Sequence, residues 1–188
     1  MSRQRGTTLL TLARNAIAQD LGVHERTFVD AAWLDDVGAC FVTLTQNGEL
    51  RGCIGSLEAV RPLRAEVAAN ARAAAFRDPR FAPLTREDYP TVQVEVSLLS
   101  PTEPLRFDSE KQALAQLRPG VDGIVLEYRR QRSTFLPQVW EQLEEPRDFL
   151  AQLKKKAGLS TDFWHADLRL ARYRVEKWRE RDSTQEST

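Results

Sequence analysis

The chain is poor in the residues that build disulfide frameworks and metal sites. Its 188 residues include two cysteines and two histidines. Cys40 and Cys53 are not spaced as a CxxC pair, and we interpret them as free thiols of a cytoplasmic protein. His24 and His165 are far apart in the sequence and show no metal-ligand spacing, so no metal site is predicted.

Excess charge of one sign and long apolar runs are also lacking. Lys and Arg together number 27, as do Asp and Glu, which gives a formal net charge of +0. A dedicated nucleic-acid binder normally carries a basic excess, so this class is not favoured. Arg14 and Asn15 interrupt the first apolar stretch, which is therefore neither a signal peptide nor a membrane span. No phosphate-loop or dinucleotide-binding motif is present, so the sequence does not identify a cofactor.

What the sequence does contain predicts a folded domain with both helices and strands. Hydrophobic residues make up 41% of the chain, enough for a substantial core. Four elements are expected in the first half: a helix capped by Thr7 or Thr8 and closed by Gly22, a hairpin turning at Asn47-Gly48, a helix from Pro62 to about Phe76, and a half-buried strand at 92–97.

The second half shows a similar order of patterns. The expected elements are a hairpin at 124–136, a helix opening at Pro137, a helix capped by Asp148 and closed by Gly158, and a final strand at 168–172. In this comparison Leu136 takes the place of Cys53. We therefore predict an α+β fold with antiparallel sheets, flanking helices and an internal duplication.

The run Leu50-Arg-Gly-Cys-Ile-Gly55 is the most informative motif for chemistry. Glycine lets backbone approach a ligand closely, and arginine offers a fixed fork of donors. Cys53 is thus a candidate nucleophile, and Arg51, Gly52 and Gly55 are candidate ligand-binding residues. The alternative for Cys53 is a small buried thiol that packs where nothing larger fits.

Three charged residues have more than one interpretation each. Arg51 either binds an anion or pairs with Glu58 or Glu95. Arg80, after the second helix, either completes an anion site with Arg51 or is solvated beside a structural turn. Glu95 points away from the valine face of its strand, where it is a candidate general base, an arginine partner or a simple polar surface residue.

Four stretches together resemble the AMMECR-type domain family, also called AmmeMemoRadiSam system protein A. They are LRGCIG at 50–55, NARAAAFRDPRF at 70–81, QVEVSLLSP at 93–101, and FLPQV at 135–139 followed by FLAQLKKKAGL at 149–159. The resemblance extends from about Ala39 to Lys177. It implies a soluble α+β protein with a larger and a smaller lobe, and an association with Memo-like and radical-SAM proteins.

From these observations we expect one AMMECR-type domain over residues 1–180, with two intimately joined lobes and a polar tail at 181–188. The leading hypothesis is a cleft at the LRGCIG motif that binds a small polar or anionic ligand, with thiol-dependent enzyme chemistry in a pathway shared with Memo-like and radical-SAM proteins. The alternative is a non-catalytic adaptor that holds a protein partner and in which Cys53 is structural. The sequence leaves open whether the protein is an enzyme, and its oligomeric state.

Overall fold

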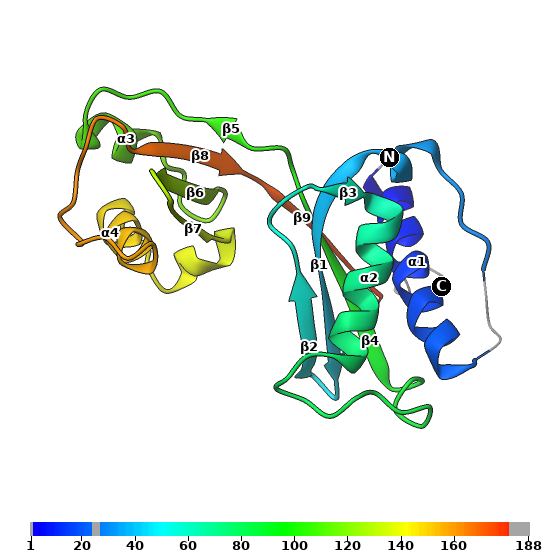
Figure 1. Cartoon of the computed structure of the whole chain (residues 1–188). Helices are drawn as coiled ribbons and strands as arrows, with labels where there is room; N and C mark the ends of the chain where they lie inside the picture. Colours follow the sequence, from blue (N-terminus) through cyan, green and yellow to red (C-terminus); the bar gives the residue numbers. More distant parts are fainter. Residues whose placement is uncertain (1, 24–26, 181–188) are drawn as a thin grey trace, which may run out of the picture. The chain divides into compact units, whose positions relative to one another are not determined.

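The computed structural model describes residues 2–23 and 27–180 (Figure 1). The chain folds into two compact units, of which unit 1 comprises Met1–Leu99 with Glu176–Thr188, and unit 2 comprises Ser100–Val175. The α+β class and the division into a larger and a smaller lobe are confirmed. That the lobes are intimately joined stays a prediction, and the predicted polar tail at 181–188 lies outside the described residues.

Unit 1 is an antiparallel sheet with two helices on one face (Figure 1). Its strands follow the order β2-β1-β4-β9, and the short β3 also pairs with β1. The elements are α1 (Ser2–Leu21), η1 (Ala32–Asp35), β1 (Val37–Gln46), β2 (Glu49–Gly55), β3 (Arg61–Pro62), α2 (Leu63–Phe76), β4 (Val92–Leu99) and β9 (Val175–Arg179).

The core of unit 1 lies between the helices and one face of this sheet. Ile17 of α1 and Val67 of α2 are fully buried there, together with Val42 of β1 and Val96 of β4. Because side chains alternate along a strand, the residues next to Val42 in β1 and next to Val96 in β4 point to the opposite face of the sheet, which we call the outer face. No helix formed by the described residues is long and apolar enough to cross a membrane.

Two predictions in unit 1 need correction. The first helix begins at Ser2, and Thr7 lies inside it, where its hydroxyl donates to the carbonyl oxygen of Arg3. β4 is not half-buried: on its outer face Glu95 is 8% exposed and Ser97 is 7% exposed. The cause is its central position between β1 and β9.

The predicted hairpin of unit 1 is confirmed. Asn47 and Gly48 both have positive φ, 54° and 88°, as a two-residue type I′ turn requires. β1 and β2 pair antiparallel with a register shift between Leu44 and Thr45. The hairpin therefore places the LRGCIG motif along β2, beside the middle of β1.

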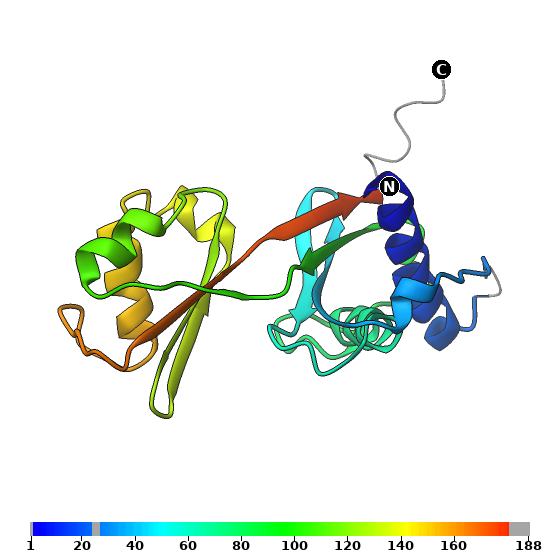
Figure 2. The same ribbon diagram turned by 90° about the horizontal axis from the view of Figure 1, so that it is seen from above.

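Unit 2 is a smaller antiparallel sheet with its own hydrophobic core. Its strands follow the order β5-β8-β6-β7, and Figure 2 shows the tip of the β6–β7 hairpin projecting beyond the helices of this unit. The elements are β5 (Glu103–Pro104), α3 (Glu110–Gln116), β6 (Gly123–Tyr128), β7 (Gln131–Phe135), η2 (Pro137–Glu141), α4 (Pro146–Lys156) and β8 (Arg169–Tyr173).

The predicted repeat is visible in the strand order. In each unit a hairpin is followed by helical structure and then by a strand that pairs with the first hairpin strand, giving β2-β1-β4 and β7-β6-β8. The match of Cys53 with Leu136 is wrong, because β7 ends at Phe135. Cys53 lies inside β2, where it pairs with Thr43, whereas Leu136 lies beyond the end of β7.

Three further predictions in the second half are corrected. Pro137 opens a 3-10 helix and not an α-helix. Asp148 is not a cap, because α4 begins at Pro146 with Glu145 as its N-cap residue. β8 is not the final strand: β9 follows it and returns to the sheet of unit 1. Its sequence, Val-Glu-Lys-Trp-Arg, is too charged for its pattern to predict a strand.

Candidate functional site

Cys53 lies on the outer face of unit 1, in a row of polar side chains that crosses three strands. Thr43 of β1 pairs with Cys53 of β2 on one side and with Glu95 of β4 on the other. The next row along, formed by Ile54, Val42 and Val96, belongs to the core beneath the helices. The alternation of side chains along the strands therefore places these polar side chains on one face of the sheet and the core residues on the other.

The sulfur and the backbone of Cys53 are both held in place. The residue is partly exposed, and the Thr43 hydroxyl donates a hydrogen bond to Sγ at 3.3 Å. Its backbone N–H donates to Oδ2 of Asp78 at 2.9 Å. Cys40, by contrast, is fully buried, and burial raises the pKa of its thiol to about 12. Of the two thiols, Cys53 is therefore the one placed for chemistry.

Asp78 connects Cys53 to a guanidinium group. Its side chain is 2% exposed and accepts from Arg80 twice, Nε to Oδ1 at 2.9 Å and Nη2 to Oδ2 at 2.7 Å. Nη2 of Arg80 also donates to the carbonyl oxygen of Cys53 at 3.2 Å. A half-exposed cation is thereby fixed beside the thiol, in a geometry that a bidentate pair holds rigidly.

The electrostatics of this trio are coupled. The Arg80 guanidinium, with the backbone N–H groups of Cys53 and Arg80, holds the pKa of Asp78 well below its usual range. In return Asp78 raises the pKa of Arg80, and the electrostatic influence of Cys53 adds to this rise. Asp78 therefore stays ionised at neutral pH, and Arg80 stays charged next to the sulfur.

Arg51 contacts neither of the two glutamates with which it was predicted to pair. Nη1 donates to the carbonyl oxygen of Ala82 at 2.7 Å, and Nη2 lies 3.7 Å from Oδ2 of Asp88. The predicted pairing with Glu58 or Glu95 is wrong. Arg51 fastens the loop after α2 to the hairpin, and its role in ligand binding, alone or with Arg80, stays a prediction.

Glu95 forms the far end of the polar row. It accepts from Nε of Arg179 at 2.9 Å, and Nζ of Lys177 lies 3.9 Å from its other oxygen. Cys53 and Glu95 are two strand spacings apart, roughly 10 Å. A direct proton transfer between them does not fit that separation. The predicted role of Glu95 as a general base stays a prediction that needs Thr43 or a ligand as a bridge.

The two glycines of the motif have clear packing roles. A Cβ on Gly52 would lie 2.1 Å from the carbonyl oxygen of Ala74 in α2, so this glycine lets the helix approach β2. A Cβ on Gly55 would lie 2.3 Å from the ring of Phe41. Both distances are far inside van der Waals contact, so the fold itself requires glycine. A contact of either residue with a ligand stays a prediction.

Cavities among the described residues include some that are lined by other residues. One of about 460 Å³ lies beside α1 in unit 1 and includes Arg14, Tyr89 and Glu180. Two cavities of about 270 and 240 Å³ share Glu127 and Arg169 in unit 2. The predicted cleft at the LRGCIG motif stays a prediction. Across residues 2–23 and 27–180, no group of three or more His, Cys, Asp or Glu side chains forms a metal site.

Sequence reasoning missed the central residue of this arrangement. Asp78 was expected to accept backbone hydrogen bonds in its turn, and it does accept from the N–H of Arg80 at 3.1 Å. Its contact with Cys53 joins positions 25 residues apart and has no local signal in the sequence. The available signal was the Asp78-Pro79-Arg80 run directly after a helix, in which an acid and a base stand two positions apart.

Comparison with known proteins gives one consistent result. The family model described as AMMECR1 matches residues 10–178. A protein of Methanothermobacter thermautotrophicus is 36% identical over 96% of this chain and 96% of its own length. A protein of Thermofilum pendens is 35% identical over 94% of this chain and 90% of its own.

A solved structure is similar in both sequence and fold. The crystal structure of the uncharacterized protein PH0010 from Pyrococcus horikoshii matches with a TM-score of 0.75 and 31% identity. The match covers 93% of this chain and 91% of that chain. The similarity thus extends over both units.

Proposed function

The chain belongs to the AMMECR1 family, and on that premise we propose that the outer face of unit 1 around Cys53 binds a small polar or anionic ligand and performs thiol-dependent chemistry on it. The observation that carries this proposal is the Cys53–Asp78–Arg80 trio. One buried carboxylate orients both the backbone of the cysteine and the guanidinium beside it.

The guanidinium supports the anionic part of the proposal. Asp78 accepts from Nε and Nη2 of Arg80, and the second N–H of Nη2 donates to the carbonyl oxygen of Cys53, so within the described residues Nη1 is the nitrogen left without a partner. Its two N–H groups can donate to an acceptor oxygen. Because the side chain of Arg80 is 53% exposed, Nη1 can reach an oxygen of a carboxylate or phosphate.

The surroundings of the sulfur support the thiol chemistry. The Thr43 hydroxyl donates to Sγ, and the Arg80 guanidinium donates to the carbonyl oxygen of the same cysteine, so the residue is held by a hydroxyl and a cation. In the reaction we propose, Sγ adds to the carbon of a carbonyl group of the ligand: the C–S bond forms as the C=O π bond opens, the electron pair goes to the carbonyl oxygen, and the thiol proton passes through solvent to that oxygen. In this proposal Arg80 binds the anionic group of the ligand. Glu95, at the other end of the polar row, faces the uncharged polar part of the ligand.

The same geometry separates this function from the adaptor alternative. A docking adaptor with a structural cysteine calls for a buried sulfur beneath an apolar surface. Here the cysteine residue is partly exposed, and its neighbours in the row are the hydroxyl of Thr43 and the carboxylate of Glu95. The charged and hydroxylated row favours a small polar ligand.

We also propose a pathway and a cellular compartment for the protein. The family resemblance is our reason for proposing that the protein works with Memo-like and radical-SAM proteins. Cys40 and Cys53 are both free thiols, which favours a reducing compartment, and we propose the cytoplasm.

A thermal-shift screen of polar metabolites tests the proposed site. The variants are Cys53→Ala and Arg80→Lys, with Arg77→Lys as the matched control at an exposed position in the same turn. A ligand of this site should stabilise the wild type and Arg77→Lys, and should stabilise Cys53→Ala and Arg80→Lys much less. Equal shifts in all four proteins would remove Cys53 and Arg80 from the site and overturn the proposal.

A further inference from the structure

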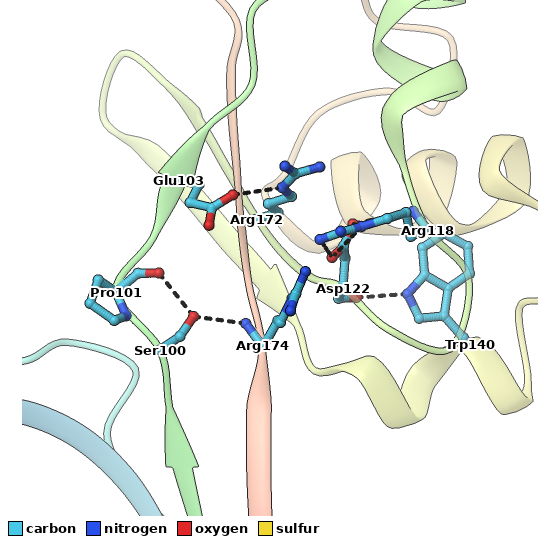
Figure 3. A network of polar contacts seen from close by, with 8 residues as sticks. All are labelled: Ser100, Pro101, Glu103, Arg118, Asp122, Trp140, Arg172 and Arg174. Carbon is cyan, nitrogen blue, oxygen red and sulfur yellow. Dashed lines mark hydrogen bonds and ion pairs between the residues drawn. The ribbon is translucent and has the colours of Figure 1, made fainter.

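Unit 2 has a cluster of arginines that the proposed function does not use. Figure 3 shows Arg118, Arg172 and Arg174 at one end of its sheet, where the chain enters and leaves the unit. Arg172 lies in β8, where it pairs with the core residue Ile124, and Arg174 stands two positions further, just after the end of β8. Arg118 follows the C-cap residue of α3.

Arg118 is fixed by a buried carboxylate. Asp122 has a fully buried side chain and accepts from the backbone N–H of Arg118 at 3.3 Å and from Nε at 2.9 Å, with a further bond from Nη2. The indole N–H of Trp140 donates to the Asp122 carbonyl oxygen at 2.7 Å. Asp122 holds Arg118 through Nε and Nη2, as Asp78 holds Arg80 in unit 1, and within the described residues the Nη1–Nη2 edge of Arg118 has no other hydrogen-bond partner.

Arg174 has a fixed backbone and an uncommitted side chain. Its N–H donates to Oγ of Ser100 at 3.0 Å, and its carbonyl oxygen accepts from the N–H of Ser100 at 2.9 Å. Within residues 2–23 and 27–180, its guanidinium makes no hydrogen bond or ion pair. Figure 3 shows this side chain extending toward the Arg118–Asp122 pair.

The cluster carries a net positive charge. Three guanidiniums face two carboxylates, Asp122 on Arg118 and Glu103 on Arg172, where Nε donates at 3.0 Å. Glu103 also contributes to the raised pKa of Arg118, so the two pairs are electrostatically connected. One positive charge and the donors of Arg174 remain without a counterpart in the cluster.

We propose that Arg118 and Arg174 form a second ligand site, which binds the phosphoryl group of a small molecule. Asp122 fixes the position of Arg118, and Arg174 supplies a second guanidinium from the position between β8 and β9. A phosphoryl group offers three oxygens and about two negative charges, which suit two guanidiniums better than a carboxylate does. The site lies wholly in unit 2 and is independent of the function proposed for Cys53.

The side-chain N–H of Trp140 provides the readout. It donates to the backbone of Asp122, so an anion on Arg118 should shift its resonance in a nitrogen–proton correlation spectrum. The full-length protein is titrated with inorganic phosphate and, separately, with glycerol 3-phosphate. Potassium acetate and potassium chloride at equal ionic strength serve as comparisons, because exposed charges are screened by salt.

The variants are Arg174→Gln and Arg174→Lys, with Arg130→Gln as the control. Arg130 is an exposed arginine in the hairpin turn of the same unit, so its replacement removes one charge without touching the cluster. We expect saturable shifts with either phosphoryl compound, unchanged in Arg130→Gln. Arg174→Gln should weaken binding about tenfold or more, and Arg174→Lys by less, because a charged hydrogen-bonding fork is lost or replaced by a point charge.

Two results would overturn the proposal. One is the absence of a saturable shift with both phosphoryl compounds, or equal shifts with acetate. The other is equal affinity in Arg174→Gln and Arg130→Gln. Binding of glycerol 3-phosphate but not inorganic phosphate would assign the site to a phosphate ester, and the reverse to the free ion; either result supports a phosphoryl site.

Discussion

The carboxylate of Asp78 accepts a hydrogen bond from the backbone N–H of Cys53 at 2.9 Å, across 25 positions of the chain. This bond ties the end of α2 to the middle of β2. The same carboxylate holds Arg80 in a bidentate pair, so one buried side chain is shared by the backbone of the motif and by a cation. The stability of unit 1 and the geometry of the candidate site therefore depend on the same group.

Replacing that carboxylate should lower the stability of the protein. Asp78→Asn keeps the shape but loses the charge and one acceptor, so either Cys53 or Arg80 is left underbonded. We expect the free energy of unfolding to fall by about 1–3 kcal/mol. Urea denaturation followed by tryptophan fluorescence measures it.

Asp36→Asn is the control for this change, because Asp36 is exposed and its side chain bonds to no described residue. We expect it to alter stability by less than about 0.5 kcal/mol. If Asp78→Asn were equally mild, Asp78 would not be the anchor that its contacts indicate.

The pH dependence of stability should show the same group. The pKa of Asp78 is lower in the folded state than in the unfolded chain, so its ionised form favours folding. Its contribution is complete above the unfolded value of about 3.9 and is lost as the pH falls through the lower folded value. Wild type should lose more stability than Asp78→Asn between about pH 5 and pH 2.

Urea midpoints at several pH values in that window provide this measurement. The pKa of Asp88 is also lowered, chiefly by hydrogen bonds from Thr85. Because Asp88 is present in both proteins, the difference between the two curves isolates Asp78. Parallel curves would mean that the charge of Asp78 contributes nothing to folding.

Local signals were sufficient for much of the fold. Asn47-Gly48 predicted the hairpin because a two-residue type I′ turn needs two positive φ angles. β9 could not be predicted, because a charged strand on the edge of a sheet lacks the apolar alternation that marks a strand. Its place beside β4 is decided by long-range pairing.

The candidate site divides in the same way. Cys53 and Arg80 could both be selected as candidate site residues from the sequence, because each lies in a short continuous motif, LRGCIG at 50–55 and NARAAAFRDPRF at 70–81. The partners of Arg51 and Glu95 were wrong or undecided, since Ala82 and Arg179 reach them through loops and a returning strand. Sequence patterns identify which residues carry chemistry, and only the folded chain decides which of them meet.

The packing role of Gly52 can be tested against a glycine with a different function. Gly52→Ala places a Cβ against the carbonyl oxygen of Ala74, and backbone cannot move aside as a flexible side chain can. We expect a loss of about 1–3 kcal/mol in the free energy of unfolding. Gly48→Asn should cost less than about 0.5 kcal/mol, because Asn accepts positive φ and the site has open space. Equal losses in the two variants would contradict the close approach of α2 to β2.

The two thiols should differ sharply in reactivity. Cys40 is fully buried and its pKa is raised to about 12, so at pH 8 it has almost no thiolate to react. Cys53 is partly exposed on the outer face. Native protein treated with iodoacetamide should gain one label, at Cys53, as measured by intact and peptide mass spectrometry. Cys53→Ser should gain none while folded and one after denaturation in guanidinium chloride, which shows that Cys40 is shielded and not already modified. Labelling of Cys40 in the native protein, or none at Cys53, would remove the accessible thiol on which the proposed chemistry depends.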